Sequence, residues 1–97
     1  MTVVSVSRWK GNSQDTSHAK QIAPVLKRHG AISVRIGNCI AGAYAGQVFG
    51  VITFPDWETY GKAMQGLSDD PEYQKVLAEL SSTFQLQERS IMSVEDL

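Results

Sequence analysis

Two side chains in the sequence are of the types that move protons or hold a polarised oxygen, His18 and Tyr60. His18 lies in the first turn of a helix predicted over residues 15–29, where the helix dipole favours the neutral imidazole. A neutral imidazole beside a pocket can act as a general base. The hydroxyl of Tyr60 is of the kind that can place an enolate oxygen. We therefore name His18 and Tyr60 as candidate catalytic residues, with an exposed or capping histidine and a core tyrosine as the alternatives.

A second set of side chains is suited to holding a small molecule. Arg8 stands within a predicted strand, where an arginine can bind a carboxylate through two parallel hydrogen bonds. Arg8 can equally pair with an acidic side chain of the same chain, such as Glu88, or bind across a dimer. Tryptophan and tyrosine offer large apolar bodies with one polar tip, which suits small-molecule pockets. The candidate ligand-binding residues are Arg8, Trp9, Tyr44, Trp57 and Met64.

The stretch VFGVITFPDWETY, residues 48–60, joins a predicted strand to a predicted helix. Pro55 ends the strand ladder because proline has no backbone N–H. After it, Trp57, Tyr60 and Met64 recur at helical spacing. In one interpretation they form a stripe of the core, and in the other they form the wall of a pocket. Both hold together when a pocket opens off the core.

Metal and cofactor chemistry finds no supporting pattern in the sequence. His18 and His29 stand near opposite ends of one predicted helix, without the cysteine or acid pair that a metal site needs. Cys39 is the single cysteine and has no sequence neighbour that would lower its pKa. Neither a GxGxxG nor a GKS/T phosphate loop is present. We therefore expect no metal and no cofactor.

Composition sets the class of the protein. Ninety-seven residues make one small domain over 1–97, and a hydrophobic share of 42% with a charged share of 20% fits a soluble globular chain. The net charge of −1 without a basic block disfavours a nucleic-acid surface. No apolar run is long enough to span a membrane. A lone cysteine and a start that does not resemble a signal peptide predict a cytoplasmic protein.

Hydrophobic spacing predicts strands and helices in alternation. The clearest strand is AISVRIG, residues 31–37, in which Ile32, Val34 and Ile36 face one way and Arg35 faces the other. Asp70 and Pro71 mark the start of the last helix, and Gly30 the end of the first. The predicted elements are a strand at 2–9, a helix at 15–29, strands at 31–37 and 44–54, helices after Pro55 and after Asp70, and a strand from about residue 84.

This order, β-α-β-β-α-β with the second helical region split in two, is that of the α+β ferredoxin-like fold. Its four-stranded antiparallel sheet carries the helices on one face and leaves the other face bare. Phe49 and Val51 fall on that bare face and are too apolar for open water. A second copy packed sheet to sheet would cover them, since a symmetric dimer uses the same patch twice. The sequence therefore predicts a homodimer through the sheet face.

The element order over residues 2–94, with the stretches VITFPDWETY and SDDPEYQKVLAEL, resembles the dimeric α/β-barrel superfamily. That group includes proteins similar to antibiotic-biosynthesis monooxygenases, haem-degrading monooxygenases and stress-responsive barrel proteins. The resemblance implies a barrel of two sheets and a pocket between each sheet and its own helices. The haem-degrading branch needs a histidine after the tryptophan that Trp57 matches, and both histidines here come earlier in the chain. Haem binding is therefore not predicted.

Three functions remain open. The first is a homodimeric small-molecule-binding barrel of unassigned activity, with a small apolar or aromatic ligand between sheet and helices. The second is a cofactor-independent monooxygenase or isomerase in the same pocket, acting on a small aromatic or polyketide-like substrate, with His18 as base. The third is a structural or regulatory dimer without a ligand. Whether the protein is an enzyme is left open.

Overall fold

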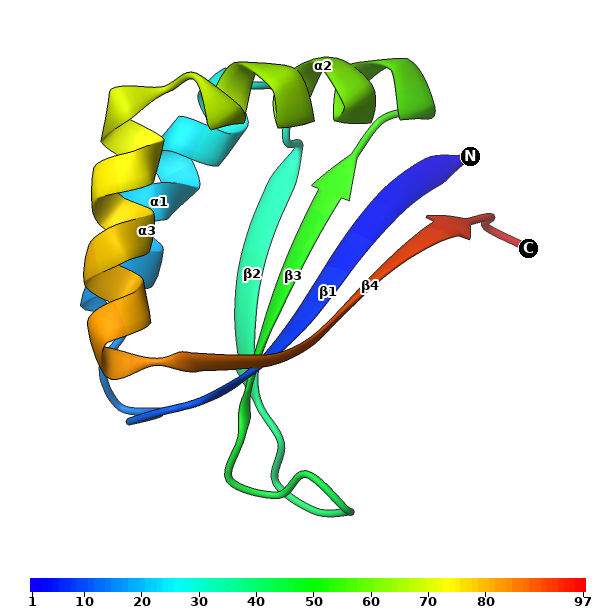
Figure 1. The fold of residues 1–97 in the computed structure, drawn as a ribbon. Helices are drawn as coiled ribbons and strands as arrows, with labels where there is room; N and C mark the ends of the chain where they lie inside the picture. The colour runs from blue at the N-terminus through cyan, green and yellow to red at the C-terminus, as the bar shows by residue number, and fades with distance from the viewer.

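The computed structural model describes residues 1–97 as a four-stranded sheet whose helices lie on one face (Figure 1). The predicted ferredoxin-like order, with the second helical region in two parts, is confirmed. The elements are β1 (Thr2–Lys10), α1 (Ser17–Arg28), β2 (Ser33–Asn38), β3 (Val48–Phe54), α2 (Trp57–Ser68), α3 (Pro71–Thr83) and β4 (Gln85–Val94). None of the three helices combines the length and apolar character that crossing a bilayer requires.

The strands lie in the order β2-β3-β1-β4, and all neighbours are antiparallel. In the pairing of β1 with β3, Val3 stands opposite Phe54 and Ser7 opposite Gly50. Paired residues share a face, and successive residues of a strand alternate between faces. Val3 and Phe54 are 0% and 1% exposed and pack against buried residues of α1 and α2. The odd-numbered residues of β1 from Val3 to Trp9 therefore face the helices.

The opposite face of the sheet has no element of the chain over it (Figure 1). Register places Val6 opposite Val51, and Val4 opposite Met92, on this face. Phe49, opposite Arg8, lies there as well, as the sequence predicted for Phe49 and Val51. Met92 is 44% exposed and the other apolar side chains of the face are half-buried. Apolar side chains therefore gather on this face, beside the polar Arg8, Arg35 and Thr53 that the register places in the same rows.

Short-range chemistry sets the helix boundaries. The side chain of Asp56 accepts a hydrogen bond from the Thr59 backbone N–H at 2.7 Å and begins α2. Gly30 has a φ of 114°, the left-handed conformation that lets the chain turn after α1. The predicted start of α1 at residue 15 is wrong by two residues. The Asp15 carboxylate accepts from the Ser17 N–H at 3.1 Å, so Asp15 stays outside the helix.

The predicted starts of β2 and β3 require correction, and β2 begins at Ser33 and not at residue 31. β3 begins at Val48 and not at residue 44, because Gly42 and Gly46 adopt φ of 110° and 86° and turn the chain before the ladder begins. Ile32 and Ile36 are 59% and 42% exposed, and of the three alternating residues only Val34 packs against the core. β2 is an edge strand, so its ends extend past the helices that cover the sheet.

An ion-pair cluster ties the end of α1 to the start of α3. Oδ1 of Asp70 accepts from the Glu72 N–H at 2.9 Å, as the predicted cap of α3. Oδ2 of Asp70 lies 2.7 Å from Nε2 of His29 and 3.1 Å from Nη2 of Arg28. These bonds, the one with His29 above all, lower the pKa of Asp70 from 3.8 to about 2. Asp70 therefore joins two helices that are distant in sequence.

We expect Asp70→Asn to lower the melting temperature by an amount that depends on pH. The pKa of Asp70 is lower in the folded protein, about 2 against 3.8. Its contribution is therefore complete above about pH 4 and disappears as the pH falls through 2. Asparagine keeps the capping oxygen but not the charge. Thermal unfolding between pH 5 and pH 2 should show the difference from the wild type shrinking toward zero.

The neighbouring Asp69→Asn is the matched control, because the Asp69 side chain is exposed and makes no ion pair. The Asp69→Asn protein should follow the wild type at every pH. A melting-temperature difference for Asp70→Asn that stays constant down to pH 2 would contradict the role assigned to its charge.

Candidate functional site

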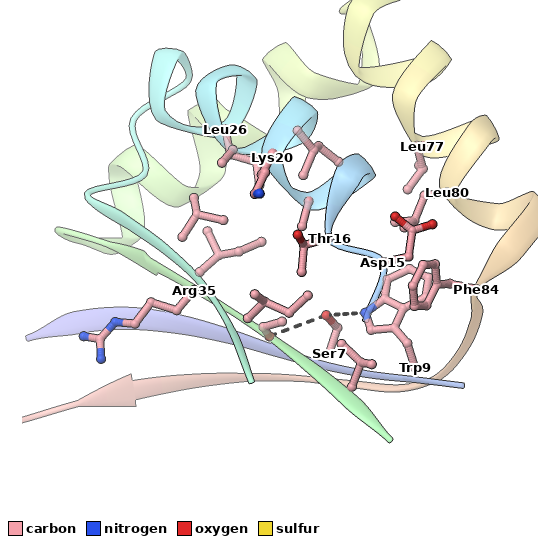
Figure 2. A pocket seen from close by; sticks show the side chains of 18 of the residues that line it. Ser7, Trp9, Asp15, Thr16, Lys20, Leu26, Arg35, Leu77, Leu80 and Phe84 are labelled. Atoms are coloured by element: carbon pink, nitrogen blue, oxygen red, sulfur yellow. Dashed lines mark hydrogen bonds between the residues drawn. The ribbon is translucent and has the colours of Figure 1, made fainter. Parts of the chain in front are cut away.

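A cavity of about 320 Å³ lies between the sheet and the helices α1 and α3 (Figure 2). Thirteen of the 20 residues that line it are hydrophobic. Leu26 of α1, Leu77 and Leu80 of α3 and Ile52 of β3 supply much of this apolar wall. Toward α3 and β4 the cavity adjoins a second, more open hollow, which shares several of its residues with the first. The cavity is therefore an apolar space that opens toward the edge of the sheet.

The cavity exists because small residues face one another across the helix–sheet seam. Ala19 and Ala23 lie one turn apart on the face of α1 that lines it. On the sheet, Gly50 stands opposite Ser7. A Cβ atom at Gly50 would lie 2.9 Å from the Ser7 Oγ, which is too close without a shift. Protein interiors are otherwise packed with few voids larger than a water molecule. Larger side chains at these positions would fill the space.

The floor of the cavity carries a polar pair. Trp9 Nε1 donates a hydrogen bond to Ser7 Oγ at 2.8 Å (Figure 2). The Ser7 hydroxyl faces the Gly50 carbonyl only at 3.5 Å, which is long for an O–H donor. Ser7 is 6% exposed, so its hydroxyl is buried at the floor of the cavity. With the indole N–H on its oxygen, the Ser7 hydroxyl keeps its proton available for a group placed in the cavity.

Four charged residues also line the cavity: Asp15, Lys20, Arg35 and Arg89. Asp15 accepts hydrogen bonds from the hydroxyl of Ser17 at 2.6 Å and from its N–H at 3.1 Å. The Ser17 hydroxyl is the main cause of the lowered pKa of Asp15. A carboxylate with a lowered pKa is a poor proton acceptor at neutral pH. The cationic groups therefore dominate the charge of the lining.

Of the residues predicted to bind a ligand, Trp9 lines the cavity. Arg8 and Tyr44 lie elsewhere, since Arg8 projects from the opposite face of the sheet. Its guanidinium stacks 3.8 Å from the centre of the Tyr44 ring and donates to the Gln47 side chain at 2.8 Å. It also pairs with Glu88 at 3.3 Å, the ion pair that the sequence left open. All of these contacts are within the chain.

His18 does not line the cavity, although it belongs to α1. It lies one turn before Ile22, which lines the cavity, and two turns before the fully buried Val25. Its Nδ1 atom is shielded from solvent and has no hydrogen-bond partner. His18 is thus next to the cavity wall without being part of its lining, and Tyr60 of α2 is not part of the lining either.

Tyr60, Trp57 and Met64 belong to α2, and none of the three lines the cavity. The Tyr60 ring meets Phe54 edge to face at 5.4 Å and Trp57 at 5.8 Å. Such pairs add to the stability that burial provides. Tyr60 packs against the core, whereas Trp57 is 52% and Met64 37% exposed. Tyr60 therefore sits in the core stripe, and the other two extend it to the surface.

The sequence analysis missed Ser7, Gly50, Lys20 and Arg89 as cavity residues. A signal existed for Ser7, since polar Ser5 and Ser7 alternate with valines along β1. No such pattern marked Arg89, because only the pairing of β4 with β1 brings it opposite Ser7. No three His, Cys, Asp or Glu side chains come together in an arrangement that could hold a metal ion.

The model of one protein family matches residues 6–94, which is nearly the whole chain. The chain belongs to the family described as Domain of unknown function (DUF6854). No curated protein matches this DUF6854 chain. The family model therefore covers every element that lines the cavity, from Ser7 to Arg89.

Solved structures share the fold of the DUF6854 chain at low sequence identity. SnoaB, a cofactor-independent oxygenase from Streptomyces nogalater, has a TM-score of 0.74 at 12% identity, over 99% of this chain and 95% of that one. A dimeric ferredoxin-like protein from an uncultured marine organism has a TM-score of 0.68 at 16% identity, over 98% of both chains. A NIPSNAP family protein from Agrobacterium tumefaciens has 0.66 at 16%, over 99% and 95%. These likenesses confirm the predicted ferredoxin-like fold.

Proposed function

We propose that the chain is a homodimeric protein that binds a small apolar or aromatic molecule in the cavity between the sheet and the helices α1 and α3. The observation that carries this proposal is the cavity itself, with a volume of about 320 Å³, apolar walls and the polar Ser7–Trp9 pair in its floor. Ligand sites in proteins are mostly apolar spaces of about 300 to 1,000 Å³ with a few placed polar groups. This cavity is at the lower end of that range and suits a small ring system.

The energetics of packing favour a bound molecule in the cavity. An unfilled apolar space forfeits dispersion contacts, and the cost grows by roughly 24 cal/mol for each Å³ of cavity. Replacing Ala19 or Ala23 by a larger apolar residue would remove the space at no cost in polar contacts. A bound apolar molecule restores the missing contacts and leaves the small residues in place. The hydroxyl of Ser7 and the indole of Trp9 would orient it.

The dimer part of the proposal rests on the bare face of the sheet. Val4, Val6, Val51, Phe49 and Met92 lie together there with no element over them. A large apolar patch on a soluble protein marks an interaction surface. A second copy related by a two-fold axis would bury the same patch twice. The fold shared with a protein described as dimeric and ferredoxin-like supports this arrangement.

A second candidate function is favoured by the similarity to SnoaB, which is described as a cofactor-independent oxygenase. On this reading the cavity binds an aromatic or polyketide-like substrate and the chain acts as a cofactor-independent monooxygenase or isomerase. His18 as base and Tyr60 as enolate partner remain predictions, and neither lines the cavity. A structural or regulatory dimer without a ligand is the third function, and it is the outcome if no ligand binds.

We expect Ala23→Leu to abolish ligand binding while leaving the fold intact. The added methyl groups would fill the cavity from α1, and filling a void costs little or stabilises. In a thermal-shift screen, small aromatic compounds that bind the cavity should raise the melting temperature of the wild type, because they bind only the folded state. Ala23→Leu should show no shift with the same compounds. Ala78→Leu, the same change on the exposed face of α3, is the control and should shift like the wild type.

Val51→Lys should convert the dimer to a monomer. Val51 lies in the middle of the bare face, and a dimer there would have to bury an unpaired ammonium group. Light scattering should give about twice the chain mass of 10.6 kDa for the wild type and the single-chain mass for the variant. Gln65→Lys, an added charge on the exposed surface of α2, should stay dimeric. A wild-type protein that scatters as a monomer contradicts the proposed dimer.

Oxygen uptake tests the oxygenase alternative. With a phenolic compound that passes the thermal-shift screen, an oxygen electrode should record consumption by the wild type and none by Ala23→Leu. If His18 is the base, His18→Ala should slow uptake by about 10² to 10⁴. Uptake at the wild-type rate in both His18→Ala and Tyr60→Phe removes the catalytic role of these residues. A ligand that binds without any uptake leaves the binding protein as the function.

A further inference from the structure

The charge of the cavity differs from that of the chain. The whole chain has a net charge of −1. The lining holds the cationic side chains of Lys20 and Arg89 against one carboxylate, Asp15, whereas Arg35 borders the cavity from a strand position that faces the other side of the sheet. Asp15 already accepts hydrogen bonds from Ser17 and forms no ion pair with Lys20 or Arg89. A space with apolar walls and an excess of positive charge favours an anionic ligand.

The cationic residues of the lining are also free of internal partners. The ion pairs of the structure involve Arg8, Arg28, His29 and Lys62 as the cations. Lys20 and Arg89 take part in none of them. Arg89 thus differs from Arg8 one strand away, whose guanidinium is held by Glu88 and Gln47. Its five N–H donors stay available to a ligand.

Strand pairing places Arg89 next to the buried hydroxyl of the floor. Arg89 of β4 is the register partner of Ser7 of β1, and Ser7 is the partner of Gly50 of β3. These residues form one row across the helix-facing side of the sheet, in which the absence of a side chain at Gly50 makes room for the Ser7 hydroxyl. The register shifts just beyond this row, between Arg8 and Trp9, so the row ends where Trp9 begins to cover the floor.

The hydrogen bonds in this row determine which groups can donate to a ligand. Trp9 Nε1 donates to Ser7 Oγ at 2.8 Å, so the oxygen of Ser7 is already an acceptor. The Ser7 hydroxyl can then donate its proton to an anion beside Arg89. An arginine can hold a carboxylate by two parallel hydrogen bonds, and a hydroxyl donor adds a third. From the other wall, Lys20 of α1 contributes a second positive charge. The guanidinium of Arg35 points away from the cavity (Figure 2).

We propose that the ligand of this cavity is an apolar monocarboxylic acid, and that Arg89, Ser7 and Lys20 form the subsite that holds its carboxylate. This rests on the proposed ligand-binding function and names the chemical class of the ligand. The ring or chain of the acid lies along the apolar wall of α1 and α3. The carboxylate lies over the Gly50–Ser7–Arg89 row, near the opening toward β4.

The test compares two probes of nearly the same shape, 2-naphthoate and the neutral 2-naphthamide, by isothermal titration calorimetry. The wild type should bind 2-naphthoate at least about tenfold more tightly, the size expected for hydrogen bonds to a charged group. Raising NaCl from about 0.02 M to about 0.5 M should weaken 2-naphthoate and leave 2-naphthamide unchanged. The indole N–H resonance of Trp9, assigned with a Trp57→Phe variant, should move with either probe.

Single variants of the proposed subsite residues, with one matched arginine control, test which groups hold the carboxylate. Arg89→Met should lose about tenfold in affinity for 2-naphthoate and little for 2-naphthamide, because methionine keeps the apolar stem but not the charge. Lys20→Met and Ser7→Ala should show the same selective loss. Arg35→Met is the control, since it removes a cavity-edge arginine whose guanidinium points away, and it should bind both probes like the wild type.

The outcomes separate this inference from the function on which it rests. Equal affinity for the two probes, or equal losses in Arg89→Met and Arg35→Met, overturns the carboxylate subsite. If both probes still bind and Ala23→Leu abolishes both, the small-molecule-binding function stands without it. If neither probe binds at millimolar concentration, both proposals fail for this class of ligand.

Discussion

The antiparallel register of β1 with its two neighbours is the constraint on which the rest of the structure depends. Pairing Val3 with Phe54 turns both side chains under the helices, where they are almost completely buried. Because side chains alternate along a strand, that pairing also decides the face of Ser7 and Trp9. A slip by one residue would bring Arg8 under the helices. The burial of Val3 and Phe54 therefore holds the cavity floor in place.

The helices cover this floor without filling the space above it. α2 closes one end of the sheet, where Tyr60 packs edge to face on Phe54. α1 and α3 run over the rest, and alanines on α1 face a glycine and a serine on the sheet. At this separation of α1 from the sheet, side chains this small do not fill the seam to the packing density usual in protein interiors. The cavity is thus a consequence of residue size along one seam, within a fold that is otherwise well packed.

Much of the fold could be predicted because its signals are local. Asp56 and Asp70 each bind the backbone N–H groups of the turn that follows them, so the start of both helices can be predicted from a few residues. Alternation along β1 and across AISVRIG indicated strands in the same way. The start of β3 was missed because residues 44–47 are compatible with a strand by type. The turns at Gly42 and Gly46 delay pairing until Val48.

The candidate site was predicted less well, since its residues come from six separate elements. Trp9 was named from its type and lines the cavity, whereas Arg8 was named on the same grounds and projects from the other face. Arg8 and Trp9 are successive residues of β1, so their side chains point to opposite faces of the sheet. Which of the two faces the helices depends on the burial of residues elsewhere in the fold. Trp57 and Met64 have the right spacing for a stripe, yet they lie on the helix that closes the end of the sheet.

By itself the sequence determined the elements, their order and the helix caps, because these follow from spacing and from bonds within a few residues. It also determined that Phe49 and Val51 share a face. Only the tertiary structure decided that Gly50, Ser7 and Arg89 form one row and that His18 stays outside the cavity. The physical reason is that strand register and helix rotation are set by the burial of distant apolar residues, and no local pattern carries that information.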